Sequence, residues 1–176
     1  MGKEINSPPV KLITAIYTNQ INLFTVIEEK LAGKFGDIDS KSEIFDFNYT
    51  DYYEKEMGKD LKKRFISFEK LIEPPELADI KIFTNHVESQ YLKDNKRRVN
   101  IDPGYLTLAK LVLASTKDYS HRIYLKSGIY AEVTLFYQDN EFRCLPWTYP
   151  DYKSEFGLSF FKKARSVYHK QIILTK

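Results

Sequence analysis

The chain has 176 residues, of which 43% are hydrophobic and 29% charged, and its net charge is +3. This length suits one domain with its own core, and the composition is that of a globular rather than a disordered chain. No apolar run approaches the roughly 18 residues that cross a bilayer, and the first nine residues have no signal-peptide core, so we expect a cytoplasmic protein that does not engage a membrane.

The charge is unevenly distributed along the chain. Residues 1–92 carry 12 basic and 16 acidic side chains, a net −4, whereas residues 93–176 carry 15 and 8, a net +7. The second half is therefore where a site for an anionic ligand is sought, although solvated surfaces also vary this much. The single cysteine, Cys144, can form no internal disulfide and has no CxxC partner, so no zinc site is predicted.

The first elements are a strand and a helix. Residues 10–18 (VKLITAIYT) are apolar on both alternating sets, which predicts a central strand covered on both faces. Apolar residues then recur at steps of three and four from Ile21 to Phe35, which predicts an amphipathic helix that Gly36 ends. Residues 1–9 are expected to be flexible.

A ferredoxin-like order follows from the next segments. Residues 43–49 (EIFDFNY) and 64–72 (RFISFEKLI) predict two strands, joined by a polar connection or short helix over residues 52–63. Pro74 and Pro75 open a second amphipathic helix. The first half therefore predicts β-α-β-β-α, as in a ferredoxin-like split unit.

The second half predicts further strands. Residues 98–102 form a strand that ends at the turn pair Pro103-Gly104, after a charged loop over residues 93–97. Residues 105–116 fit helix and strand about equally, and we favour a turn followed by a strand from Lys110. If this segment is helical, the sheet order changes and the proposed groove is lost.

A β-hairpin over residues 121–137 is the clearest local prediction. Its loop is Lys126-Ser127-Gly128, with glycine where φ must be positive. This register makes apolar residues face each other and opposite charges meet, in the pairs Leu125–Ile129, Ile123–Ala131 and Arg122–Glu132.

A C-terminal helix completes the predicted fold. Its inner face is expected to carry Phe156, Phe160, Ala164, Val167 and Tyr168. The fold class is accordingly α+β, one domain over residues 1–176 with a mainly antiparallel sheet.

Polar side chains gather on the strand over residues 98–102 and on the hairpin. The period of two places Arg98, Asn100 and Asp102 on one face. Carboxylates, an imidazole and cationic groups then lie on neighbouring elements and can hold a phosphate, move a proton and bind Mg²⁺, the candidate metal. We predict Asp102, His121 and Glu132 as catalytic and Arg98, Asn100, Lys117 and Arg122 as ligand-binding residues.

Two simpler interpretations stay open for these residues. The strand residues can belong to an outer sheet face whose charges pair for solubility. A second polar stripe on the helix after Pro75 can flank the same groove, although a solvated helix face explains it more simply. The stripe contains Lys81, Thr84, Asn85 and Glu88, and we include Lys81, Asn85 and Glu88 among the ligand-binding candidates.

The segment over residues 144–152 (CLPWTYPDY) offers aromatic rings. Trp147, Tyr149 and Tyr152 can stack on nucleic-acid bases. A loop packed under its own rings and prolines is the simpler interpretation, and we favour it.

Several strings in the chain resemble a known family. They are RVNIDPGYL (98–106), HRIYLKSGIYAEVTL (121–135), WTYPDY (147–152) and IKIFTNHVE (80–88). They resemble the prokaryotic family of uncharacterised proteins called domain of unknown function 4416, over nearly the whole chain. The resemblance implies no established activity.

The sequence contains no GxxxxGK[ST] loop, GxGxxG, GxSxG or HExxH, so the nucleotide-binding and hydrolytic sites with those signatures are excluded. The leading hypothesis is a site for a phosphate-bearing ligand, either a nucleotide or an RNA end, with metal-assisted hydrolysis as the candidate chemistry. The alternative is a non-catalytic RNA-associated or scaffold module that uses the basic second half, including Lys162, Lys163 and Arg165. The oligomeric state is left open.

Overall fold

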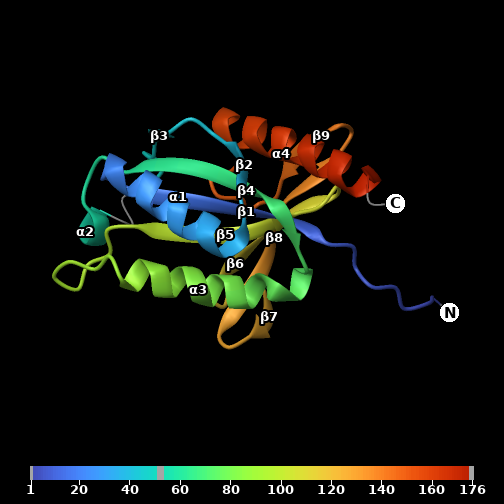
Figure 1. The fold of residues 1–176 in the computed structure, drawn as a ribbon, viewed down its shortest axis with the longest axis horizontal. Helices are drawn as coiled ribbons and strands as arrows, with labels where there is room; N and C mark the ends of the chain where they lie inside the picture. The colour runs from blue at the N-terminus through green and yellow to red at the C-terminus, as the bar shows by residue number, and fades with distance from the viewer. Residues whose placement is uncertain (1, 51–53, 175–176) are drawn as a thin grey trace.

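The computed structural model describes residues 2–50 and 54–174, and within these ranges nine strands form one sheet accompanied by helices (Figure 1). None of the helices in the described part of the chain combines the length and apolar composition needed to cross a membrane. The elements follow the order β1 (Val10–Thr18), α1 (Ile21–Phe35), β2 (Ile38–Lys41), β3 (Phe45–Asp46), α2 (Glu54–Met57), β4 (Lys62–Ile72), a 3-10 helix (Pro74–Glu76), α3 (Leu77–Ser89), β5 (Asn100–Leu106), β6 (Lys110–Ser115), β7 (Ile123–Lys126), β8 (Ile129–Gln138), β9 (Glu141–Cys144) and α4 (Glu155–Leu174).

The first half has ferredoxin-like topology. The strand order is β2-β4-β1-β5, and each strand is antiparallel to its neighbours. β1 and β2 therefore run parallel with β4 between them, connected by α1, while α3 connects β4 to β5 across β1. Two interleaved β-α-β units of this kind define the ferredoxin-like arrangement, which confirms the predicted α+β fold class.

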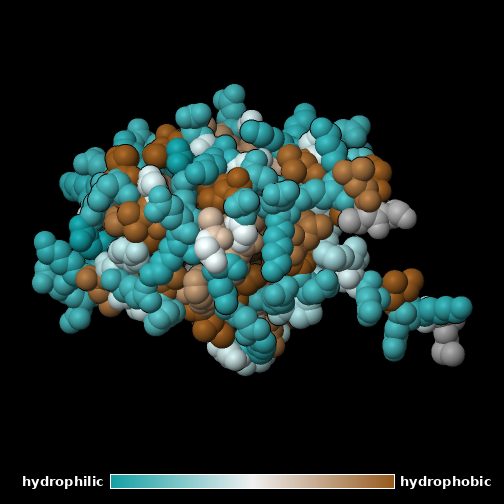
Figure 2. Space-filling view, in the orientation of Figure 1, coloured by the Kyte–Doolittle hydropathy of each residue, from teal (hydrophilic) through white to brown (hydrophobic). Residues whose placement is uncertain are grey.

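The central strand β1 is buried on both faces, as its sequence predicts. Leu12 and Ile16 belong to the core beneath α1 and α3, which lie across the near face of the sheet in Figure 1. Ile13 and Tyr17 belong to the core on the opposite face, where α4 packs. Figure 2 shows that hydrophilic side chains cover most of the surface over α1 and α3, as expected for amphipathic helices.

The second half extends the same sheet beyond β5. β6, β8 and β7 follow in that order, and β9 pairs with the far end of β8. The strand predicted from Lys110 is confirmed as β6. The hairpin is confirmed as β7 and β8, and Ile123 pairs with Ala131 as predicted.

The sheet forks at Gly104. This residue pairs with both β1 and β6, but residues 100–103 of β5 pair with β1 alone. Beyond Leu113, β6 continues beside β8 alone. A Cβ on Gly104 would lie 2.4 Å from the carbonyl oxygen of Val112, so the two strands can meet here only at a glycine. We call the opening between residues 100–103 and 113–115 the fork.

Two local predictions are wrong. Pro103-Gly104 lies inside β5 and forms no turn, because the strand is open on one side at Pro103, where a proline is tolerated. The hairpin turn has two residues, since Ser127 and Gly128 both have positive φ, and Lys126 rather than Leu125 pairs with Ile129.

Other boundaries also differ from the prediction. Only two residues of the strand predicted over 43–49 form a strand, β3, and the edge strand β2 was not predicted because its sequence, IDSK, is mostly polar. Residues 54–57 form the short helix expected between strands, while residues 52 and 53 lie outside the described residues. On α4, Phe156 is 51% exposed, and Phe161 is buried in its place.

Candidate functional site

A cavity of about 530 Å³ opens in the fork. Its walls come from β1, β5, β6, β8 and α3, together with residues 149–152 before α4. This size, and the convergence of several elements, is typical of small-molecule sites. The residues of the predicted site that border the cavity are Lys81, Asn85, Asn100, Asp102, Lys117, Arg122 and Glu132.

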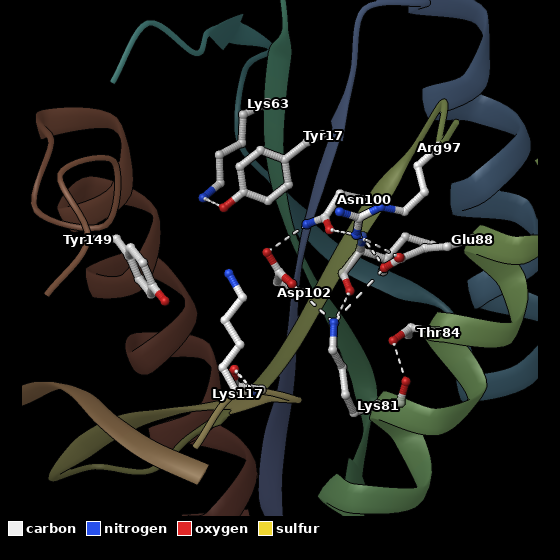
Figure 3. A network of polar contacts seen from close by, with 12 residues as sticks. Tyr17, Lys63, Lys81, Thr84, Glu88, Arg97, Asn100, Asp102, Lys117 and Tyr149 are labelled. Atoms are coloured by element: carbon white, nitrogen blue, oxygen red, sulfur yellow. Dashed lines mark hydrogen bonds and ion pairs between the residues drawn. The ribbon is translucent and has the colours of Figure 1, made fainter. Parts of the chain in front are cut away.

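Asp102 lies at the centre of the polar network shown in Figure 3. Lys81 Nζ lies 3.1 Å from Asp102 Oδ1 and donates to the carbonyl oxygen of Ile101 at 2.9 Å. The Asn100 amide donates to Asp102 Oδ2 at 2.8 Å. The Asp102 side chain is 26% exposed, against 7% for Lys81, so these contacts hold its carboxylate at the cavity surface.

Glu88 supports this arrangement from α3. Its Oε1 accepts a hydrogen bond of 2.8 Å from the backbone N–H of Ile101, on the edge of β5. Burial raises the pKa of Glu88, and the nearby Lys81 ammonium opposes that effect. The helix stripe is therefore not the solvated face that the sequence favoured: Lys81, Thr84 and Glu88 are buried, because this side of α3 faces β5.

Arg97, rather than the predicted Arg98, lies beside Asn100 at the cavity. Its guanidinium makes two hydrogen bonds of 2.7 Å to Glu56 and one of 2.8 Å to Asn100 Oδ1, and the pKa of Arg97 is raised chiefly by Glu56. Arg98 instead hydrogen bonds to Gln20 beside a second depression. The predicted alternation fails here because β5 begins only at Asn100.

Arg122 and Glu132 form a buried pair on one side of the cavity. Arg122 Nε donates to Glu132 Oε2 at 2.6 Å, and each side chain is 1% exposed. The other guanidinium nitrogens donate to Ser115 Oγ, to the Lys117 carbonyl oxygen and to Tyr149 Oη at 2.8–3.0 Å. Arg122 therefore connects β6, β8 and the segment before α4. Its role is structural.

His121 lies behind Glu132. Its Nε2 is 3.1 Å from Glu132 Oε2, and its ring stacks on Trp147 with 4.8 Å between centroids. Trp147 Nε1 donates to the carbonyl oxygen of Val133 at 2.8 Å. His121 is thus separated from the cavity by the carboxylate that it contacts.

Lys117 and Tyr149 face the cavity opposite α3. In Figure 3 the Lys117 ammonium is directed into the space between Asp102 and Tyr149. Tyr149 is exposed and its hydroxyl is held by Arg122, whereas Tyr152 is 2% exposed in the core. The aromatic segment is therefore packed mainly on the protein itself, as the simpler interpretation predicted.

A further charged cluster was not predicted from the sequence. Lys63, on β4, is fully buried and pairs with Asp151, and its Nζ donates to Tyr17 Oη at 2.6 Å. Tyr17 and Asp151 border the cavity. The predicted strand began two residues too late, at Arg64, and so left out Lys63. Period-two alternation extended to Lys63 would have placed it on the face of the buried Phe65.

Metal-binding side chains are sparse in the described part of the chain. Within it, no three His, Cys, Asp or Glu side chains converge in a group that could hold a metal ion. Asp102 and Glu132 both border the cavity, but the Asp102 oxygens accept from Lys81 and Asn100, and the Glu132 oxygens accept from Arg122 and Thr134.

The fold and the cavity define an α+β protein with a ferredoxin-like half, an extended antiparallel sheet and a polar pocket where that sheet forks. Residues 8–168 match the family described as Domain of unknown function (DUF4416), and the chain belongs to that family. The resemblance seen in the sequence is thereby confirmed. No curated protein and no solved structure matches the chain.

Proposed function

We propose that the fork cavity binds a small phosphate-bearing ligand, for which a nucleotide is the best fit. The observation that carries the proposal is that a cavity of about 530 Å³ is lined by Lys81, which pairs with Asp102, and by Lys117, whose ammonium is directed into the space between Asp102 and Tyr149. Ammonium groups are point charges suited to phosphate oxygens. The cavity volume lies within the range of roughly 300–1,000 Å³ found for small-molecule sites.

The remaining walls suit the other parts of a nucleotide. Tyr149 offers an exposed aromatic surface for a planar ring, and Asn85 offers an amide that both donates and accepts hydrogen bonds. Asp102 can accept from a ribose hydroxyl or a base N–H. A cytoplasmic site of action is part of the proposal and rests on the sequence alone.

An RNA-binding surface is less well supported. Lys162 and Lys163 are exposed on α4, but of the three aromatic residues considered for stacking on bases, Trp147 and Tyr152 are engaged within the protein and Tyr149 alone is exposed. An RNA end remains compatible with the cavity as a terminal phosphate group. Longer RNA would show a steep loss of affinity with salt.

A thermal-shift screen tests the proposal. Nucleotides, sugar phosphates and short RNAs are added with and without Mg²⁺, and a ligand at a hundredfold excess over Kd stabilises the protein by about 2.7 kcal/mol. Lys117→Met is expected to weaken every hit, since it removes a cation at the cavity. Lys126→Met is the matched control, because Lys126 is exposed on β7 and pairs with the exposed Asp79.

Asp102→Ala is expected to abolish the stabilisation by these ligands, because it removes the proposed acceptor for a ribose hydroxyl or base N–H and leaves the Lys81 ammonium without the carboxylate that positions it. A flat screen, or hits that respond equally to Lys117→Met and Lys126→Met, would overturn the proposal. A response confined to long RNAs and lost on neutralising Lys162, Lys163 and Arg165 would establish RNA binding on α4 instead.

A further inference from the structure

Lys63 lies behind the cavity wall in an aromatic enclosure. Its Nζ is 4.3 Å, 4.2 Å and 4.0 Å from the ring centroids of Tyr17, Phe65 and Tyr152, and its side chain is 0% exposed. Such rings stabilise a cation through their negative faces but do not replace its hydration. The charge of Lys63 is therefore held chiefly by its ion pair with Asp151.

Tyr17 links this cluster to the cavity. Its hydroxyl accepts a hydrogen bond from Lys63 at 2.6 Å and can donate to Asp151 Oδ2 at 3.2 Å. Figure 3 shows the Tyr17 hydroxyl and the Lys63 ammonium side by side, above Asp102. Since Tyr17 borders the cavity and Lys63 is buried behind it, a proton on Lys63 can reach a bound ligand through the phenol oxygen.

The cluster is also poised to release a proton at moderate pH. Burial lowers the pKa of Lys63 from 10.5 to about 8, although Asp151 and Asp102 oppose that effect. Tyr152 is the other titratable residue beside Lys63, and burial raises the pKa of its phenol well above the usual value. An acid or base works best when its pKa lies near the operating pH.

We infer that Tyr17 is a general acid–base residue for the ligand of the fork cavity, with Lys63 and Asp151 as its positioning residues. This inference rests on the proposed function. The proton moves from Tyr17 Oη to an oxygen of the phosphate-bearing ligand, and the Lys63 ammonium then donates a proton to the phenolate. The ligand gains one proton, Lys63 becomes neutral, and Asp151 stays ionised throughout.

Tyr17 differs from Asp102, His121 and Glu132, the residues to which the sequence assigned catalysis. His121 does not border the cavity, and the carboxylate of Glu132, which does border it, is held in the buried ion pair with Arg122.

A pH titration of the ligand-free protein labelled with ¹³C at tyrosine Cζ tests the inference, and Tyr17→Phe identifies the Tyr17 resonance. We expect this resonance to shift in a step centred near the Lys63 pKa of about 8, because the hydrogen bond that Tyr17 Oη accepts from the ammonium changes when Lys63 loses its proton. Tyr168 is the matched control, because it is buried, its hydroxyl donates to the Pro9 carbonyl oxygen, and burial raises its pKa. Its resonance should move only at higher pH.

A double variant, Lys63→Met with Asp151→Asn, removes both buried charges together and leaves no unpaired ion. In it the step near pH 8 should be absent from the Tyr17 resonance. The inference is overturned if the Tyr17 resonance shows no step near pH 8 in the wild type, or if the double variant keeps that step unchanged. Because the titration contains no ligand, its failure is distinct from a flat ligand screen.

Discussion

Arg122 Nε and Glu132 Oε2 lie 2.6 Å apart, and each side chain is 1% exposed. The sequence left open whether these residues belong to a ligand site or to a surface ion pair. The structure shows a buried pair that joins strands at one side of the cavity. Removing one partner of such a pair leaves an uncompensated charge in the interior.

Glu132→Gln is therefore expected to destabilise the protein by about 3 kcal/mol, because Arg122 would remain buried with a neutral partner. Urea unfolding of the variant and the wild type measures the change. Glu141→Gln is the matched control, since Glu141 pairs with Arg143 at an exposed site, where an ion pair contributes roughly 0–1 kcal/mol. Equal losses of stability in the two variants would show that the Arg122–Glu132 pair contributes no more to folding than an exposed ion pair does.

The junction of the fork depends on Gly104. Gly104→Ala is expected to destabilise the protein by about 2 kcal/mol or more, because the new Cβ would lie 2.4 Å from a backbone oxygen and 2.6 Å from Leu113 Cδ2. Gly33→Ala on α1 is the control, since nothing lies within 4 Å of its Cβ position, and it should stabilise by about 0.5–1 kcal/mol. Chemical denaturation measures the free energy of unfolding of both variants. If Gly104→Ala leaves that free energy unchanged, the strands are not in close contact at Gly104.

Burial of Lys63 makes stability depend on pH. Its pKa is about 8 in the folded protein and 10.5 in the unfolded chain, so between these values the unfolded state binds more protons and stability rises with pH. The cost of the buried charge is fully present below pH 8 and is relieved as pH approaches 10.5. The free energy of unfolding of the wild type should rise by about 3 kcal/mol across this window, relative to the Lys63→Met/Asp151→Asn variant.

Denaturation at several pH values measures that difference. A constant difference between the two proteins from pH 8 to pH 10.5 would mean that Lys63 titrates alike in both states, and so is not strongly desolvated.

The fold was largely predictable because its strongest signals are local. The apolar run at residues 10–18 and the helical period from Ile21 to Phe35 predict buried elements, and both are observed. The errors fall where tertiary context overrides local preference. Pro103-Gly104 has the composition of a turn, but it forms a strand because the sheet is open beside Pro103 and close-packed at Gly104.

The candidate site was predictable only in part. Period-two and hairpin arguments brought Asp102, Lys117 and Glu132 together, and the three border one cavity. The sequence could not show that Arg122 is fully engaged in structural contacts. Nor could it bring Tyr17 and Asp151 together, since they are far apart in the chain and meet only through the fold.

The most direct test of the central claim, that the fork cavity binds a phosphate-bearing ligand, is chemical-shift mapping. The ¹H–¹⁵N spectrum is recorded while the strongest nucleotide hit of the screen is added. Amide shifts are expected to change at residues 100–102, 113–117 and 149–152, which surround the cavity. Changes concentrated on α4, or spectra that do not change at all, would contradict the claim.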